Sequence, residues 1–121
     1  MLQITPQMRV LVAVAPVDFR KGIDGLASLC KAFLKQDPFA GTVFVFRNRR
    51  RDRMKVIYWD RDGFALWYKR LERGTFRFPA PRDGAHSVEV DHATLTLILE
   101  GIDVRGVRRQ QRFQRSSQRP A

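Results

Sequence analysis

The chain has 121 residues, of which 44% are hydrophobic and 11% aromatic, and its formal net charge is +11. This length fits one domain with a single core, and the composition is that of a folded rather than a disordered chain. No apolar run approaches the roughly 18 residues of a transmembrane helix, so we expect no membrane partner. The lone cysteine, Cys30, cannot form an internal disulfide, which fits the reducing environment of a cytoplasmic protein.

The first third of the chain predicts a strand followed by a helix. The apolar run at residues 9–15 has the composition of a strand. From Ile23 onward, apolar residues recur at steps of three and four, which predicts a helix with one apolar face. We expect this helix to stop near Asp37, because the residue before a proline avoids the α region. Cys30 lies on the apolar face and is predicted to be a buried thiol, since no base is identified that would activate it as a nucleophile.

The middle of the chain alternates apolar and polar residues as strands do. Residues 43–46, 54–59, 64–69 and 75–78 predict four strands, joined by connections at 47–53, 60–63 and 72–74. An antiparallel meander places the first and third connections at one end of the sheet and the second at the other. The shared end would then gather Arg47, Arg49, Arg50, Arg51, Arg53, Arg70 and Arg73, with Asp60 and Asp62 at the opposite end.

The last part of the chain predicts a second helix and a basic tail. Asp91 can cap a helix that ends near Gly101. The predicted fold class is therefore α+β, a mostly antiparallel β-meander covered by two helices, with a basic C-terminal tail. We expect a single domain at residues 1–104 and a disordered, arginine-rich tail at 105–121. The apolar positions of the second helix are Leu95, Ile98, Leu99 and Ile102.

The positive charge is concentrated in two short segments. Residues 47–53 hold five arginines and one aspartate, and residues 105–121 hold six arginines and no acidic residue. Clustered guanidinium groups attract polyanions and bind phosphate in a bidentate manner. If the tail were helical, its arginines would fall within about a third of the helix circumference, as in a segment that folds when it binds along phosphates. The alternative is a solvated tail in which this spacing arises by chance. The tail arginines are Arg105, Arg108, Arg109, Arg112, Arg115 and Arg119.

Aromatic side chains in the strands suggest two candidates for stacking on nucleic-acid bases. Most of the strand aromatics are needed to fill the core of a small sheet. Strand alternation predicts that Lys55, Ile57 and Trp59 share a face of mixed polarity. Trp59 and Trp67 are therefore the candidates for base stacking, although single exposed aromatic residues are also common without any ligand.

Catalytic and metal-binding groups are sparse. Asp18, Asp24, Asp60 and Asp62 could be considered as a carboxylate set for metal-dependent phosphodiester cleavage. Turn and helix-start roles account for these residues better. The two histidines lie six positions apart without a cysteine or carboxylate pattern that suits zinc. We therefore predict that the protein is not an enzyme and has no metal site and no cofactor.

Six ordered blocks of sequence carry a family resemblance. They are DFRKGIDGL at 18–26, DPFAG at 37–41, VFVFRNRR at 43–50, YWDRDGF at 58–64, KRLERG at 69–74 and LEGID at 99–103. Over residues 4–105 the chain resembles the TnpB-type accessory protein, or second open reading frame product, of the bacterial insertion-sequence family numbered sixty-six. The resemblance departs at Arg51, where the family often has glycine, and at Val104, where it often has an aromatic residue.

The resemblance implies a small transposition accessory protein that acts beside a second accessory protein and a separate transposase, which performs the DNA chemistry. No catalytic residues carry over from it. With the charge pattern, we expect non-enzymatic binding of nucleic acid, most simply DNA, through phosphate contacts that position the protein without reading sequence. The alternative is an adaptor that binds the transposase through an exposed sheet edge or the loop at 18–26.

Overall fold

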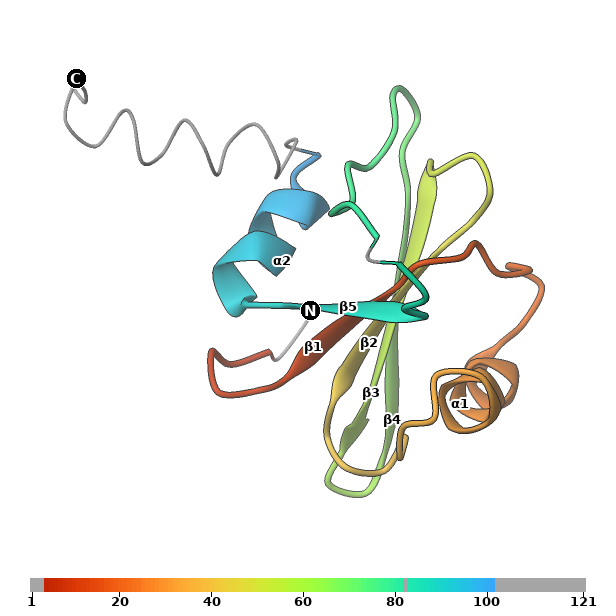
Figure 1. Cartoon of the computed structure of the whole chain (residues 1–121), viewed down its shortest axis with the longest axis vertical. Helices are drawn as coiled ribbons and strands as arrows, with labels where there is room; N and C mark the ends of the chain where they lie inside the picture. Colours follow the sequence, from red (N-terminus) through yellow and green to blue (C-terminus); the bar gives the residue numbers. More distant parts are fainter. Residues whose placement is uncertain (1–3, 82, 102–121) are drawn as a thin grey trace, which may run out of the picture.

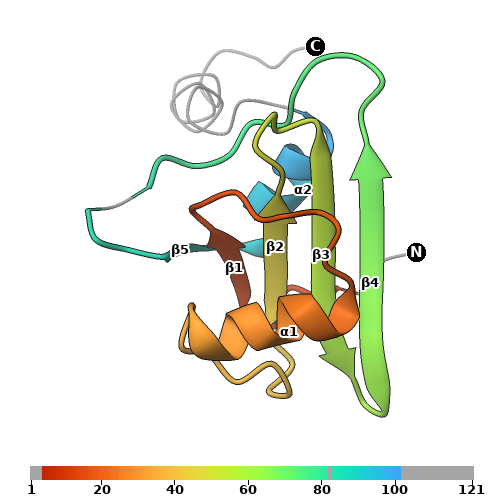
Figure 2. The same ribbon diagram turned by 90° about the vertical axis from the view of Figure 1, so that its right-hand side faces the viewer.

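The structure is a computed structural model that describes residues 4–81 and 83–101. One five-stranded sheet lies between two helices, α1 on one face and α2 on the other (Figures 1 and 2). The predicted α+β class is confirmed. The elements are β1 (Val10–Ala13), α1 (Ile23–Ala32), β2 (Val43–Arg47), β3 (Arg53–Asp60), β4 (Gly63–Arg70), β5 (Ser87–Val90) and α2 (His92–Leu99).

The strand order in the sheet is β4-β3-β2-β1-β5. β2, β3 and β4 form the predicted antiparallel meander, and β5 adds to β1 antiparallel. β1 and β2 are parallel, with α1 in the connection between them. Since parallel strands cannot be joined by a tight turn, the crossover through α1 is what allows β2 to lie parallel beside β1.

The central strands bury side chains on both faces of the sheet. The core on the α2 side contains Met54, Val56 and Tyr58, packed with Leu95 and Ile98 of α2. Ile57 lies instead in a second core on the α1 side, so the mixed face expected there is in fact covered. The sheet supports two cores because a crossover helix and a C-terminal helix cover opposite faces. The second core contains Leu11, Ala13, Leu26, Cys30, Leu34, Phe44, Phe46 and Ile57.

α1 ends at Ala32, five residues earlier than expected. Lys35 adopts a left-handed conformation with a φ of 58°, and the backbone N–H of Gln36 donates to the carbonyl of Cys30 (2.8 Å). A left-handed residue reverses the chain and ends the helix without any need for the following proline. Cys30 is fully buried, as predicted, and burial raises the pKa of its thiol to about 12.

The fourth predicted meander strand is absent, because residues 75–78 form no strand. Phe76 is buried in the α2-side core, and its N–H donates to the carbonyl of Arg51 (2.7 Å) rather than to a neighbouring strand. Pro79 and Pro81 follow, and neither has a backbone N–H that could donate to a neighbouring strand. The segment leads to β5, a strand that the sequence pattern did not indicate.

α2 begins and ends as predicted. The carboxylate of Asp91 caps the helix by accepting a hydrogen bond from the backbone N–H of Thr94 (2.7 Å). Gly101 lies just after the helix with a φ of 78°, in the conformation that glycine adopts without strain. Ile102, the boundary predicted at 104 and the tail arginines lie outside the described residues.

Candidate nucleic-acid interface

The connection between β2 and β3 is a tight turn held by its own polar residues. The N–H of Arg51 donates to the carbonyl of Asn48 (3.2 Å), and the side chain of Asn48 bonds both the carboxylate of Asp52 (2.6 Å) and the backbone N–H of Arg53 (3.0 Å). The side chains of Arg49, Arg50 and Arg51 are exposed. Because Asn48 and Asp52 satisfy each other inside the turn, the arginines are presented outward on an ordered backbone.

Asp52 is the one acidic residue in the 47–53 segment. Its hydrogen bond from Asn48 lowers the pKa of its carboxyl group, and the nearby Arg53 and Arg50 lower it further. The charged carboxylate therefore accepts a hydrogen bond within the turn, from the side chain of Asn48. It offsets part of the local positive charge without forming an ion pair with Arg49 or Arg51 at salt-bridge distance.

A second arginine-bearing segment lies against this turn. Arg70 at the end of β4 is the register partner of Arg53. The N–H of Leu71 donates to the carbonyl of Asp52 (2.8 Å), and the N–H of Phe76 donates to the carbonyl of Arg51 (2.7 Å). This confirms the predicted meeting of the first and third connections. We call residues 47–53 and 70–77 together the arginine end. Its exposed arginines are Arg49, Arg50, Arg51, Arg70, Arg73 and Arg77.

The arginines of this end are not equivalent. Arg70 forms an ion pair with Glu72 (3.0 Å), whose hydrogen bond raises the pKa of the guanidinium group. Arg47 is half-buried: it donates to the carbonyl of Val14 (3.0 Å), and its Cζ lies 5.9 Å from the ring centroid of Phe78. Burial lowers the pKa of Arg47, with a further decrease from the neighbouring arginines. Arg47 therefore joins β2 to the chain after β1, while Arg49 and its neighbours remain open to a ligand.

Arg77 belongs to the exposed set, although sequence analysis did not select it. It lies between buried Phe76 and half-buried Phe78. The alternation that suggested a strand also predicts that Arg77 points away from the core. That signal was present in the sequence, but Arg77 lies in a predicted strand and outside the two segments in which the positive charge is concentrated.

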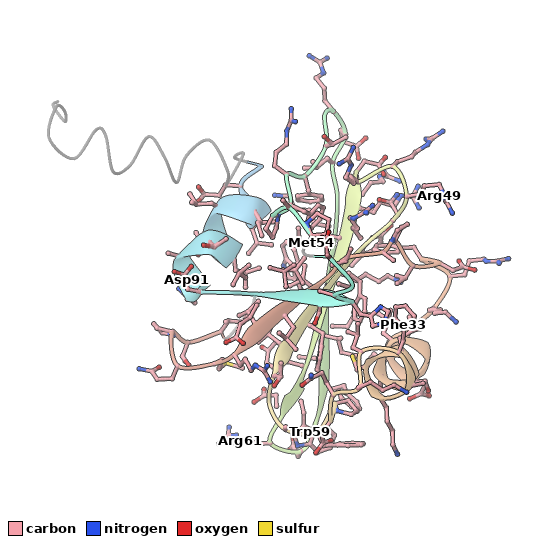
Figure 3. All side chains as sticks on the ribbon, in the orientation of Figure 1. Phe33, Arg49, Met54, Trp59, Arg61 and Asp91 are labelled. Atoms are coloured by element: carbon pink, nitrogen blue, oxygen red, sulfur yellow. The ribbon has the colours of Figure 1, made fainter. Side chains whose placement is uncertain are left out.

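The two tryptophans predicted as stacking candidates lie in different surroundings. Trp59 lies toward the opposite end of the sheet, near Arg61 and away from Arg49 (Figure 3). There it packs against Phe39 and Phe64, each with ring centroids 5.1 Å away. Trp67 is the register partner of Val56 and packs against the α2-side core. Both side chains thus have packing partners within the protein.

Lys55 is a buried lysine, whereas strand alternation predicted only that it shares a face of mixed polarity. Its Nζ donates to the carbonyls of Phe19 (2.9 Å) and Lys21 (2.8 Å) and lies 5.0 Å from the Phe19 ring centroid. These bonds hold the loop before α1 against β3. A lysine in the strand position between apolar residues was the available signal, but its partners are more than thirty residues away and follow no local pattern.

The four aspartates considered for metal-dependent cleavage do not gather. Asp18 forms an ion pair with Arg20 (2.7 Å), and this hydrogen bond lowers the pKa of Asp18 to about 2. Asp24 lies in the first turn of α1, and Asp60 and Asp62 lie at the β3–β4 turn. Within residues 4–81 and 83–101, no three histidine, cysteine, aspartate or glutamate side chains are grouped so that they could hold a metal ion.

The family comparison covers all six of the sequence blocks. The family described as IS66 Orf2 like protein matches residues 8–109. The chain belongs to this family. Two relatives come from Sinorhizobium fredii. "Uncharacterized protein y4jC" is 43% identical over 102 residues, which cover 84% of this chain and 86% of the relative. "Uncharacterized protein y4hO" is 39% identical over 105 residues, or 87% and 90% of the two chains. No solved structure matches this chain significantly.

This IS66 Orf2-like protein is therefore an insertion-sequence accessory protein, and its family is not a known class of enzyme. In the described part of the chain, neither helix is long and apolar enough to cross a membrane. The matched region includes the whole arginine end and both helices.

Proposed function

We propose that this accessory protein supports transposition by binding DNA non-enzymatically through the arginine end. The observation that carries the proposal is the ordered turn at 48–52, which presents three consecutive exposed arginines beside Arg73 and Arg77. Guanidinium groups on a fixed backbone lose less entropy when they bind phosphate than they would on a flexible chain. Phosphate contacts of this kind give affinity and orientation with little preference for sequence.

The tail arginines at 105–121 extend the same proposal. They would add a second set of phosphate contacts to those of the arginine end. We also propose that the element's transposase and second accessory protein act on the same DNA, so that DNA binding brings this protein to them.

The test compares the salt dependence of DNA binding for three forms of the full-length protein. Each phosphate neutralised contributes about −0.9 to the slope of log K against log salt on duplex DNA. Changing Arg49, Arg50 and Arg51 together to glutamine should make the slope shallower by about two to three units. The matched control changes Lys31, Lys35 and Arg61 to glutamine, which removes the same charge from the end of α1 and the opposite turn.

The control should bind DNA with a slope close to that of the unmodified protein. Equal slopes for all three forms, or binding that does not respond to salt, would refute the role of the arginine end. Including single-stranded DNA and RNA at the same salt concentrations distinguishes the class of nucleic acid.

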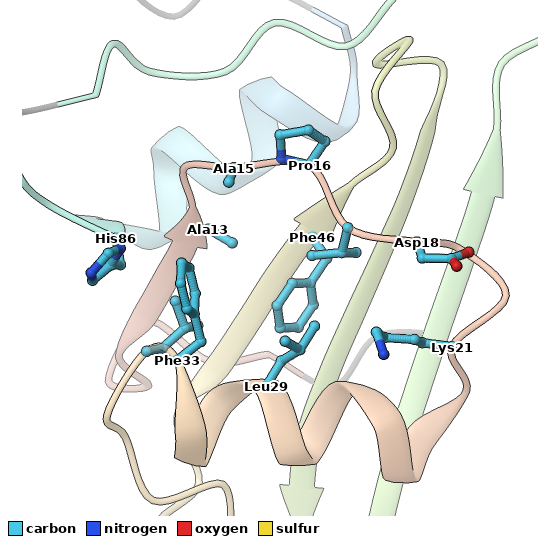
Figure 4. A pocket seen from close by; sticks show the side chains of 11 residues that line it. Ala13, Ala15, Pro16, Asp18, Lys21, Leu29, Phe33, Phe46 and His86 are labelled. Carbon is cyan, nitrogen blue, oxygen red and sulfur yellow. The ribbon is translucent and has the colours of Figure 1, made fainter.

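A pocket supports a second candidate function, that of an adaptor for the transposase. It has a volume of about 280 Å³ and lies between α1 and the segment after β1. Figure 4 shows Leu29, Phe33 and Phe46 on its inner side, with Asp18 and Lys21 at one end. Phe33 is 45% exposed and packs against His86 (ring centroids 4.4 Å apart), so it presents an apolar surface at the edge of the pocket.

The adaptor function predicts copurification with the transposase after nuclease treatment. Phe33→Ser should abolish that copurification while DNA binding is retained, whereas the triple glutamine variant of the turn should do the reverse. Loss of both properties in one variant that remains folded would contradict the separation of the two functions.

A further inference from the structure

β4 is the outer strand of the sheet on one side (Figure 2). In the described residues no strand lies beyond it. The bond from the N–H of Leu71 to the carbonyl of Asp52 fixes the phase of the β3–β4 ladder. In an antiparallel ladder alternate residues exchange both backbone bonds with their partners. Phe64, Leu66 and Tyr68 therefore direct their backbone N–H and C=O groups away from β3.

The side chains of these three residues form an apolar row on the α1 side of the sheet. Phe64 packs against the α1-side core, and Tyr68 lies against Phe19 (ring centroids 6.1 Å apart). Leu66 is 37% exposed and Tyr68 is 49% exposed. An eight-residue edge strand with open backbone groups and an exposed apolar row is a template for another strand.

The two ends of this edge carry opposite charges, so the edge is complementary to itself. Asp60, Arg61 and Asp62 lie at its turn end and carry one net negative charge, and Lys69 and Arg70 lie at its other end. An antiparallel copy centred on Leu66 would place Arg70 opposite Asp62 of the second copy, twice by symmetry. Arg70 has a local partner in Glu72, but an exposed pair of this kind contributes little and can exchange.

The same register matches the apolar residues. Tyr68 of one copy would lie opposite Phe64 of the other, and Leu66 would lie opposite itself. Cross-strand pairs of aromatic residues and of opposite charges are both favourable. A two-fold axis requires one patch to complement itself, and this edge meets that requirement.

We infer that β4 pairs antiparallel with β4 of a second copy of this chain, centred on Leu66, so that the two sheets become continuous. The inference rests on the edge alone and does not depend on DNA binding. Because the strands run in opposite directions, the two arginine ends lie at opposite ends of the joint sheet. A dimer that binds DNA would then contact two separate duplex segments.

The first test is site-specific cross-linking of the full-length protein. Leu66→Cys should form a disulfide-linked dimer under mild oxidation, because residue 66 faces itself across the axis. Tyr68→Cys is the matched control: its two copies would be offset by four residues, or about 13 Å, which is too far for a disulfide. The native thiol at Cys30 is buried, so the unmodified protein should not cross-link.

The second test is a charge exchange measured by analytical ultracentrifugation. Asp62→Arg and Arg70→Glu should each weaken the dimer about tenfold, because each places like charges opposite one another at two positions. The double variant should restore the affinity of the unmodified chain. Leu66→Lys, which places two charges on the axis, should give a monomer.

A monomer at every concentration would overturn the inference, and so would equal cross-linking of Leu66→Cys and Tyr68→Cys. Failure of the double variant to restore dimerisation would show that the two β4 strands do not pair in the register that places Arg70 opposite Asp62. A monomer whose β4 edge instead captures a strand of the transposase would also count against a second copy as the occupant. None of these readouts requires DNA, so they fail or succeed independently of the proposed function.

Discussion

Lys55 shows how one residue can join parts of the chain that are distant in sequence. Only 8% of its surface is exposed, and its ammonium group bonds two carbonyls in the loop before α1. Those carbonyls belong to a loop and not to a strand, so no strand ladder satisfies them, and the loop lies over the first part of β3, where Lys55 is the third residue. A charged donor is the strongest available substitute, since hydrogen bonds to charged groups are worth more than neutral ones.

We predict that Lys55→Met destabilises the protein by about 1–3 kcal/mol, because methionine retains the packing but leaves the two carbonyls without this donor. Urea denaturation measures the loss. Lys69→Met removes the same charge from an exposed position on β4 and should change the stability by no more than about 0.5 kcal/mol. Equal effects of the two substitutions would show that the Lys55 bonds contribute nothing.

Arg51 has an unusual backbone conformation, with a φ of 63°. Non-glycine residues are strained in this region by about 1 kcal/mol. A glycine, which the family resemblance leads us to expect at this position, would adopt this conformation freely, so Arg51 carries a cost in backbone strain that a glycine would not.

We predict that Arg51→Gly leaves the free energy of unfolding unchanged or raises it by up to about 1 kcal/mol, because relief of strain offsets the greater freedom of the unfolded chain. Arg49→Gly has no such strain to relieve and should lose about 0.5–1 kcal/mol. Both variants should weaken DNA binding equally, since each removes one exposed charge. Thermal unfolding and binding measurements on the same samples separate the two effects.

At the scale of secondary structure, the segment between β4 and β5 explains why one predicted strand is absent. Its alternating aromatic residues resemble a strand, but Phe76 packs into the α2-side core and bonds the β2–β3 turn. The two prolines that follow prevent a continuous ladder. We call residues 71–78 the strap, because their backbone bonds to Asp52 and Arg51 hold the two parts of the arginine end together.

We predict that Phe76→Ala costs about 3–5 kcal/mol, as expected for a fully buried phenylalanine. Phe78→Ala, at a half-buried position, should cost less. Hydrogen exchange should show the larger increase at the backbone N–H of Leu71 and Arg51 for Phe76→Ala, since the strap holds the turn. A similar loss for both substitutions would argue against this role of the strap.

Local patterns in the sequence predicted α2, the meander and the proximity of its first and third connections, because alternation and capping depend on neighbouring residues. They did not predict β5, whose four residues are recognisable only when β1 provides a partner. They also missed the early end of α1, which depends on a left-handed lysine, and the partners of Lys55. Each of these depends on contacts between distant parts of the chain.

At the scale of the whole molecule, the boundary between the domain and the tail remains a prediction. Removal of residues 105–121 should leave the free energy of unfolding nearly unchanged, since the two described cores are formed by residues before position 102. The slope of log K against log salt should become shallower by several units, because six arginines are lost. Circular dichroism of both forms with DNA would show whether helix forms only in the intact chain. Unfolding of the truncated chain would place the boundary further toward the C-terminus.

The candidate site was partly predictable for the same reasons. The arginines of the turn and Arg70 could be brought together from strand order alone. The half-buried state of Arg47 could not, because it depends on the carbonyl of Val14 in a different part of the chain. Charge content identified the region, and only the fold distinguished the arginines that are free to bind from those that hold the protein together.

The position of the arginine end opposite the Asp60 and Asp62 turn gives the monomer an electric dipole moment along its strands. In the field of a polyanion such a molecule experiences a torque, which turns the arginine end toward the surface before contact is made. The strands would then meet the DNA at a steep angle, and the α1 pocket and the β4 edge would lie on the sides of the protein, away from the contact. In an antiparallel dimer the two moments along the strands cancel. The monomer should therefore associate with DNA faster per binding site at low salt, while the dimer can approach with either end.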